Sequence, residues 1–396
     1  MIVSDQVLKA VQSIVMSEFG ETHLTLFLPV FLAALVVSGV IVLTRSAHIH
    51  RTAKGHADLE IQSVHQQPTP RVGGLAVAAG LFVASCLLYE VYGNLLSLVL
   101  VAAIPIFCAG LLEDIGSYSS PRTRLYVAIL SSLTMVVFTG QTLNSGLAPG
   151  LDQLLQVFAV GALFTVLATV AVCHSFNLVD GMNGLAISVA SIAALALAAI
   201  AYSVGDFQVA AMSGAIASAA LGVFFLNFPY GRVFLGDSGA YLLGFSVAWT
   251  GVLLLSRNPD VSSWAVLLTI FWPFIDTTAA VQRRVLKRVP ISKADRLHFH
   301  HVVMRGLEAS PQLGVSKRIA NPLTTFILLP FVAIPAGLGV LTAQDNRLAL
   351  LCLLLCVCGY FAIKSAVIRH FREVSRSATL RYVFDGWKDE AVDSFG

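Results

Sequence analysis

The fold of this chain is decided by residues 207–256, which read FQVAAMSGAIASAALGVFFLNFPYGRVFLGDSGAYLLGFSVAWTGVLLLS. Two apolar runs, residues 207–228 and 239–256, flank the short segment FLGDSG at 234–239. Each run is close to the roughly 20 residues that a helix needs to cross a bilayer. The pattern predicts two membrane-spanning helices joined at one membrane surface, with the carboxylate of Asp237 at that surface. Gly236 lets a ligand approach the backbone, although Asp237 could also serve only as a helix cap.

The composition of the whole chain favours a membrane protein. Of its 396 residues, 57% are hydrophobic and only 12% are charged, whereas soluble domains carry about 25% charged residues. The 25 basic and 22 acidic residues nearly cancel, so charge gives no argument for nucleic-acid binding. The apolar excess instead fits contact with bilayer lipids.

The apolar runs predict an all-α polytopic membrane protein, a bundle of about 11 transmembrane helices. We find no internal repeat and no linker that divides the chain, so we expect one integral-membrane domain over residues 1–396. The expected spans lie near residues 24–44, 72–92, 96–112, 124–140, 153–173, 184–204, 207–228, 239–256, 262–282, 322–342 and 347–367.

The basic residues predict the orientation, because Lys and Arg concentrate in cytoplasmic loops. With the N-terminus outside, every Lys and Arg except Lys9, Arg257 and Arg347 is cytoplasmic. The C-terminus is then cytoplasmic, with a tail at about 368–396. The same cytoplasmic loops carry most carboxylates, histidines and glycine-rich turns, so we expect the functional site on that face.

Two acidic segments on this face are candidates for phosphate chemistry. Glu113 and Asp114 end the third run, where both carboxylates could reach one cation, and Mg²⁺ prefers carboxylate oxygens together with water and substrate phosphate. A purely solvated helix end is the alternative, although acidic residues there oppose the helix dipole. The segment NLVDGMNG at 177–184 offers Asn177, Asp180 and Asn183 around a tight turn, which could also be only a cap for the next span.

Asp276 lies inside an otherwise apolar run. An ionisable group at that depth is unfavourable unless it is paired or lines a polar cavity. We therefore predict a ligand contact or a supporting role for Asp276, with Arg283 and Arg284 as candidate partners.

The most basic loop carries the segment DRLHFHH at 295–301. Arg296, His298, His300 and His301 could bind a diphosphate through hydrogen bonds and charge. Zinc binding and a merely solvated loop are the alternatives, and no cysteine accompanies the histidines as in many zinc sites.

A further loop, PTPRVGG at 68–74, precedes the second span. Its prolines favour an extended backbone, and Gly74 permits close approach. Arg71 could contact an anionic ligand, while a turn into the helix is the simpler alternative.

Taken together in this order, PTPRVGG, GLLED at 110–114, NLVDGMNG, FLGDSG and DRLHFHH resemble the polyprenyl-phosphate N-acetylhexosamine-1-phosphate transferases. This family is glycosyltransferase family 4, and the His-x-His-His pattern resembles its WecA-like branch. The likeness covers a motif-bearing core of about 45–305.

The resemblance implies an enzyme of the bacterial inner membrane with a cytoplasmic active site. It would transfer N-acetylhexosamine 1-phosphate, most commonly N-acetylglucosamine 1-phosphate, from a UDP-sugar to polyprenyl phosphate and release UMP. Mg²⁺, which Mn²⁺ could replace, would be bound by Asp237. Asp114, with Glu113, would act beside the lipid phosphate as a base or a positioning group. Asn177, Asp180 and Asn183 would shape the nucleotide and metal pocket, and the histidines would engage the sugar nucleotide.

The chain departs from the family pattern at two positions. Glu113 stands where the family usually has Asp, and Asn183 stands where it has the second Asp of Asp-Gly-x-Asp-Gly. Both departures weaken the assignment of a general base to these residues. The sequence does not determine the oligomeric state, and a homodimer is one possibility.

Two other functions remain as alternatives. A secondary transporter would place its coupling residues near the bilayer midplane, often in repeats, whereas the carboxylates here gather at one surface. A membrane lipid-diphosphate hydrolase could share the metal and the histidines but would need no lipid acceptor.

Overall fold

The computed structural model describes residues 18–52, 69–117, 120–144, 150–288, 297–309 and 315–376. Every regular element in these residues is a helix. The helices are α2 (Glu18–Leu43), α3 (Arg45–Thr52), α4 (Gly73–Tyr92), α5 (Leu95–Asp114), α6 (Pro121–Thr139), α7 (Leu151–Leu155), α8 (Phe158–Val179), α9 (Leu185–Ser203), α10 (Phe207–Asn227), α11 (Gly236–Arg257), α12 (Ser263–Thr269), α13 (Phe271–Leu286), α14 (Phe299–Ala309), α15 (Lys317–Leu341) and α16 (Asn346–Arg376).

Nine helices in the described part of the chain are long and apolar enough to cross a membrane, and the bent pair α12–α13 raises this number to ten. The prediction of an all-α polytopic membrane protein is therefore confirmed. The expected run at 124–140 forms α6, whose first turn carries Arg122 and Arg124. The count of about 11 spans and the orientation of the termini remain predictions.

The run expected as one span at 262–282 is two helices. α12 ends at Thr269, α13 begins at Phe271, and their axes differ by 87°. Pro273 lacks the N–H that would bond to the carbonyl of Thr269, so it interrupts the hydrogen-bond ladder there, yet it is tolerated in the first turn of α13. This bend determines where α13 presents Asp276.

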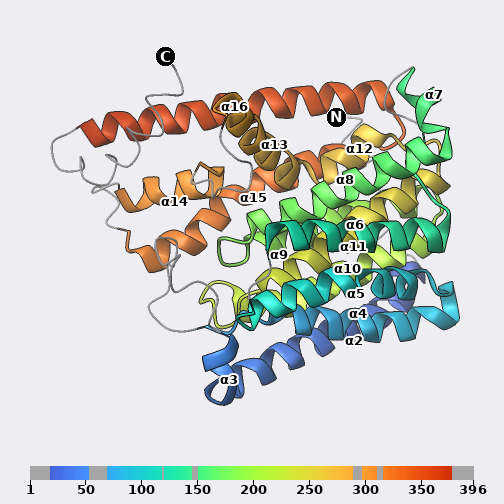
Figure 1. Cartoon of the computed structure of the whole chain (residues 1–396), viewed down its shortest axis with the longest axis horizontal. Helices are drawn as coiled ribbons and strands as arrows, with labels where there is room; N and C mark the ends of the chain where they lie inside the picture. The colour runs from blue at the N-terminus through green and yellow to red at the C-terminus, as the bar shows by residue number, and fades with distance from the viewer. Residues whose placement is uncertain are drawn as a thin grey trace.

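Helix α11 forms the centre of the bundle. It is almost completely buried and packs against α4, α5, α8, α9 and α10. Figure 1 shows α2 and α16 along opposite edges of the bundle, with α3 and α14 at one end and α7 at the other. Four of the five sequence motifs lie at ends of α4, α5, α8 and α11, and the fifth includes the start of α14, which packs against α15 and α16.

The segment before α4 pairs with the segment before α11. The N–H of Phe234 donates to the carbonyl of Pro70 at 2.8 Å, and the N–H groups of Gly73 and Gly74 donate to the carbonyls of Phe234 and Leu235 at 2.9 and 2.8 Å. A Cβ on Gly74 would overlap the hydroxyl of Ser238. Gly74, expected in substrate binding, is thus a buried packing position that lets α4 approach α11.

The C-terminal region begins with a long helix. Helix α16 continues without a break to Arg376, so the first part of the tail expected at about 368–396 is helical. Residues 377–396 lie outside the described residues. Side chains of α16 also reach Asp276, as described below, so the structural surroundings of the motifs extend beyond the expected limit of residue 305.

Candidate active site

Asp114 holds the N-terminus of α11. Its carboxylate accepts hydrogen bonds from the N–H of Asp237 at 2.7 Å, the N–H of Ser238 at 2.9 Å and the hydroxyl of Ser238 at 2.6 Å. Asp114 is only 2% exposed. The first N–H groups of a helix have no partner within it, and a carboxylate from a different helix supplies two of them here. Of the two roles predicted for Asp114, this geometry favours positioning.

Gly236 is required at the start of α11. Its φ is +76°, a conformation that is unfavourable for residues with a Cβ. A Cβ there would overlap the carbonyl oxygen of Arg71 and lie 2.6 Å from a carboxylate oxygen of Asp114. The glycine therefore permits the close contact between three separate segments of the chain.

Asp180, directly after α8, approaches the same helix end. The backbone of Gly236 hydrogen-bonds to its carboxyl group. Burial, and then the negative charge of Asp237, raises the pKa of Asp180 to about 7, while the positive charge of Arg71 opposes this rise. The structure thus brings Asp114, Asp180 and Asp237 together, as the sequence predicted.

Asp237 projects from the first turn of α11 and is bound by two arginines. Arg124 of α6 donates to one carboxylate oxygen at 2.7 Å, and Arg71 lies 3.9 Å from the other. The side chain of Asp237 is 14% exposed. The charges of Glu113 and Asp237 both attract Arg124. This cluster joins α4, α5, α6 and α11 at one polar centre.

The donor set fits one hard divalent cation but no cage made entirely of protein ligands. Among the described residues, no group of three or more His, Cys, Asp or Glu side chains is arranged to hold a metal ion. Mg²⁺ commonly uses one or two carboxylates and completes its shell with water and substrate phosphates. Asp237, partly accessible and with both oxygens facing cations, matches that requirement. The oxygens of Asp114 are instead directed at backbone N–H groups.

The two asparagines of the second acidic segment have different surroundings. Asn177 is half-buried in the last turn of α8. Asn183 is 4% exposed: its side chain donates to the carbonyl of Pro229 at 2.9 Å, and its N–H donates to the side chain of Asn321 at 2.8 Å. Asn183 therefore ties the loop after α8 to the loop after α10 and to α15.

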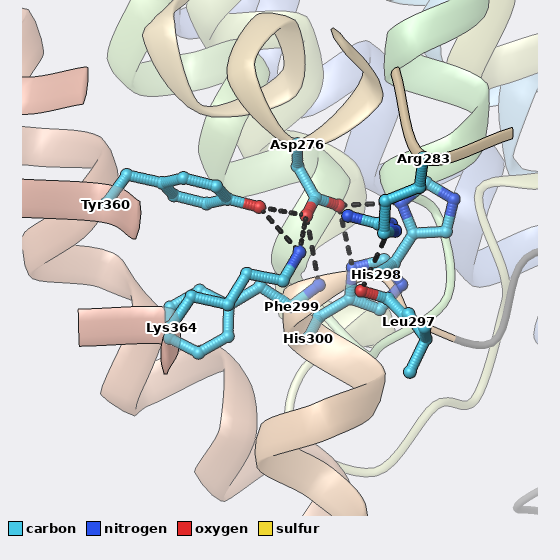
Figure 2. Close-up of polar contacts among 8 residues, drawn as sticks. All are labelled: Asp276, Arg283, Leu297, His298, Phe299, His300, Tyr360 and Lys364. Atoms are coloured by element: carbon cyan, nitrogen blue, oxygen red, sulfur yellow. Dashed lines mark hydrogen bonds and ion pairs between the residues drawn. The ribbon is translucent and has the colours of Figure 1, made fainter. Parts of the chain in front are cut away.

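Asp276 is fully buried and lies at the centre of a second polar cluster. One carboxylate oxygen accepts from Nδ1 of His298 at 2.7 Å. The other accepts from the N–H of Phe299 at 3.0 Å, the hydroxyl of Tyr360 at 2.6 Å and Nζ of Lys364 at 3.4 Å. Figure 2 shows these groups converging on the carboxylate from three directions. Of the two roles predicted for Asp276, this geometry favours support.

The histidine segment, residues 298–301, lies against the loop that carries Asp180. A Cβ on Gly181 would lie 3.1 Å from Nε2 of His300 and 3.4 Å from the ring of His301. The His300 and His301 rings have centroids 4.3 Å apart. The histidine cluster and the carboxylate cluster around α11 are therefore neighbours, connected through residues 180 and 181.

His300 is buried and has an unusual environment. Among the described residues, neither of its ring nitrogens has a hydrogen-bond partner. Burial, and then the nearby His301, holds the pKa of His300 well below its usual range. A ring nitrogen of His300 could therefore hydrogen-bond a ligand.

Three residues that contact Asp237 or Asp276 were not predicted from the sequence, namely Arg124, Tyr360 and Lys364. A signal existed for Lys364, because it is a charged residue inside an apolar run and Asp276 is an opposite charge in another. Arg124 carried a weaker signal as a basic residue at the start of a span. Arg296, expected to bind substrate, lies outside the described residues.

Comparisons with known proteins indicate the family of this chain. Residues 96–255, which include Asp114, Asp180 and Asp237, match the family described as glycosyl transferase family 4. The chain is 31% identical over 245 residues to the probable undecaprenyl-phosphate N-acetylglucosaminyl 1-phosphate transferase of Bacillus subtilis (strain 168), covering 61% of this chain and 68% of that protein.

Sequence identity and coverage are similar for two enzymes named undecaprenyl-phosphate alpha-N-acetylglucosaminyl 1-phosphate transferase. Identity to the one from Salmonella typhi is 31% over 294 residues, covering 72% of this chain and 75% of the relative. Identity to the one from Escherichia coli (strain K12) is 30% over 296 residues, covering 71% and 75%.

Proposed function

The chain belongs to glycosyl transferase family 4, and from this premise we propose that it transfers N-acetylglucosamine 1-phosphate from a UDP-sugar to undecaprenyl phosphate. A lipid phosphate oxygen attacks the sugar-linked phosphorus, the bond to the other phosphate of UDP breaks, and UMP leaves. The observation that carries the proposal is the meeting of Asp114, Asp180 and Asp237 at the N-terminus of α11, beside two arginines.

Asp237 is the residue that would hold Mg²⁺, with Mn²⁺ as a substitute. The bound ion would reduce the repulsion between the two phosphate-bearing substrates and stabilise charge on the transferred group. Asp114 fixes the backbone that presents Asp237, because its carboxylate bonds to the N–H groups of Asp237 and Ser238.

Arg71 and Arg124 neutralise Asp237 in the structure described here. Guanidinium groups bind phosphate oxygens well. Arg71 and Arg124 would therefore be placed to bind substrate phosphates beside an ion held by Asp237. Glu113 lies near enough to attract Arg124 and would limit how far it moves.

The histidines provide the second half of the site. His298 is oriented by Asp276, and His300 and His301 lie against Gly181, next to Asp180. This arrangement supports binding of the nucleotide diphosphate between the histidine segment and the carboxylates. The distribution of Lys and Arg supports a site at the cytoplasmic face of the bacterial inner membrane.

Transfer of label from UDP-[¹⁴C]GlcNAc tests the proposal. Purified protein with Mg²⁺ should form a chloroform-soluble labelled lipid and one UMP per lipid, only when undecaprenyl phosphate is present. Release of labelled sugar phosphate without the lipid would identify a hydrolase. Uptake of label into vesicles without a new product would identify a transporter.

A further inference from the structure

Helix α16 places a buried cation beside the histidine segment. Lys364 is 6% exposed and lies in an apolar helix that could span the membrane. Its Nζ is 3.4 Å from a carboxylate oxygen of Asp276 and 2.9 Å from the hydroxyl of Tyr360. A buried charge is unfavourable without partners, and here both charges are paired and hydrogen-bonded.

The two carboxylate oxygens of Asp276 accept hydrogen bonds from different partners. One faces α16, because Oδ1 accepts from Tyr360 and Lys364, and the other accepts from Nδ1 of His298. Figure 2 shows Tyr360 and Lys364 on one side of the carboxylate and His298 on the other. Asp276 therefore connects α16 directly to the histidine segment.

The hydrogen bond to Asp276 determines which ring nitrogen of His298 carries the proton and how the ring is oriented. A carboxylate can only accept hydrogen bonds, so Nδ1 of His298 carries the proton in this contact. The bond fixes the ring orientation and leaves Nε2 as the nitrogen available to another group. The N–H of Phe299 bonds to the same carboxylate at 3.0 Å, so the backbone is held as well as the ring.

From these contacts we propose that Tyr360 and Lys364 are positioning residues for the transfer reaction, because they hold Asp276 and through it His298. The proposal rests on the function proposed above. It assigns a role in donor binding to α16, which lies outside the matched region 96–255.

The kinetic test uses Tyr360→Phe, which removes one hydroxyl, and Lys364→Met, which removes the charge, with Leu355→Met on the exposed side of α16 as the control. We expect kcat/KM for the UDP-sugar to fall by about 10- to 100-fold, taking as a guide the range for loss of groups that orient metal-bound histidines. KM for undecaprenyl phosphate should change little, and Lys364→Arg should restore part of the activity. The Tm of Tyr360→Phe should fall by a few degrees, as for loss of a buried hydrogen bond.

A double-mutant cycle shows whether the effect passes through His298. In a His298→Ala background, Tyr360→Phe should lower kcat/KM less than about threefold, because the group it orients is gone. Full additivity of the two effects, or an equal loss of lipid and donor binding, would overturn the proposal.

A measurement without turnover separates this proposal from the proposed function. Diethyl pyrocarbonate modifies accessible neutral imidazoles, and peptide mass spectrometry reads each histidine separately. His298 should be modified several-fold faster in Tyr360→Phe than in the unaltered protein, while the exposed His370 reacts at the same rate in both. An unchanged rate of His298 modification in Tyr360→Phe would refute the positioning role, whatever reaction the protein catalyses. Faster His298 modification in a protein without transferase activity would refute only the proposed reaction.

Discussion

The carboxylate of Asp114, at the end of α5, accepts hydrogen bonds from both the N–H and the hydroxyl of Ser238, in the first turn of α11. These contacts join residues 124 positions apart in sequence. They fix the backbone on which Asp237 stands, and they explain why an acidic residue is stable at the C-terminal end of α5 despite the helix dipole.

Asp114→Asn should therefore damage both stability and activity. The amide offers only one acceptor oxygen, so at least one buried donor of α11 loses its partner, at a cost of about 1–3 kcal/mol. We expect a lower Tm and at least a tenfold loss of transfer, measured on detergent-purified protein. Ser238→Ala keeps both backbone hydrogen bonds and should have a smaller effect; if it proves as harmful as Asp114→Asn, the backbone contacts are not the important ones.

Gly236→Ala should prevent correct assembly of the site. The new methyl group would overlap the carbonyl of Arg71 at a residue with φ of +76°, so the backbone before α11 would have to move. Transfer activity should become undetectable, with a lower Tm. Gly337→Ala is the matched control, because a Cβ there meets no atom within 4 Å, and it should leave both quantities unchanged or slightly raise Tm.

Asn183→Asp restores the acidic residue of the family pattern but should not improve the enzyme. The side-chain amide of Asn183 donates to the carbonyl of Pro229, and a carboxylate would place a negative charge against that oxygen. We expect Tm to fall by several degrees, as for loss of a buried hydrogen bond. Higher activity with unchanged Tm would show instead that this position faces the substrates.

Asp180 should make stability depend on pH. Its pKa is raised from 3.8 to about 7 in the folded protein, so between about pH 4 and 7 the folded state keeps a proton that the unfolded state has lost. Stability therefore falls as pH rises through this range, and this contribution is constant above it. Asp180→Asn cannot titrate, so the Tm of the unaltered protein should decrease relative to this variant from pH 5 to pH 7.5. Parallel Tm curves would contradict the assigned environment.

The helices were predictable because the membrane imposes a simple length requirement on apolar runs. The meeting of Asp114, Asp180 and Asp237 was also predictable, since all three end or begin runs on the same expected face. The break between α12 and α13 at Ile270 was harder to predict. Pro29 and Pro105 lie inside unbroken helices, so a proline alone does not locate a bend.

Contacts between distant side chains were the part that sequence reasoning missed. Asp276 was correctly identified as an intramembrane charge in need of a partner, but His298 and two α16 side chains, Tyr360 and Lys364, bind it. Arg124 was not predicted as a site residue, and it reaches Asp237 from α6, which packs against α5 and α8. Such pairings depend on helix packing, which periodicity in one run does not specify.

We propose that Asp237, presented by Asp114 at the start of α11, binds a divalent cation needed for transfer. Titration with Mn²⁺, followed by electron paramagnetic resonance in the presence of UMP, tests it most directly, with Asp260→Asn in the loop after α11 as the control. We predict one saturable Mn²⁺ site, displaced by Mg²⁺, that is retained in Asp260→Asn and weakened at least tenfold in Asp237→Asn, which should also lose turnover. Unchanged Mn²⁺ affinity with full activity in Asp237→Asn would contradict the account.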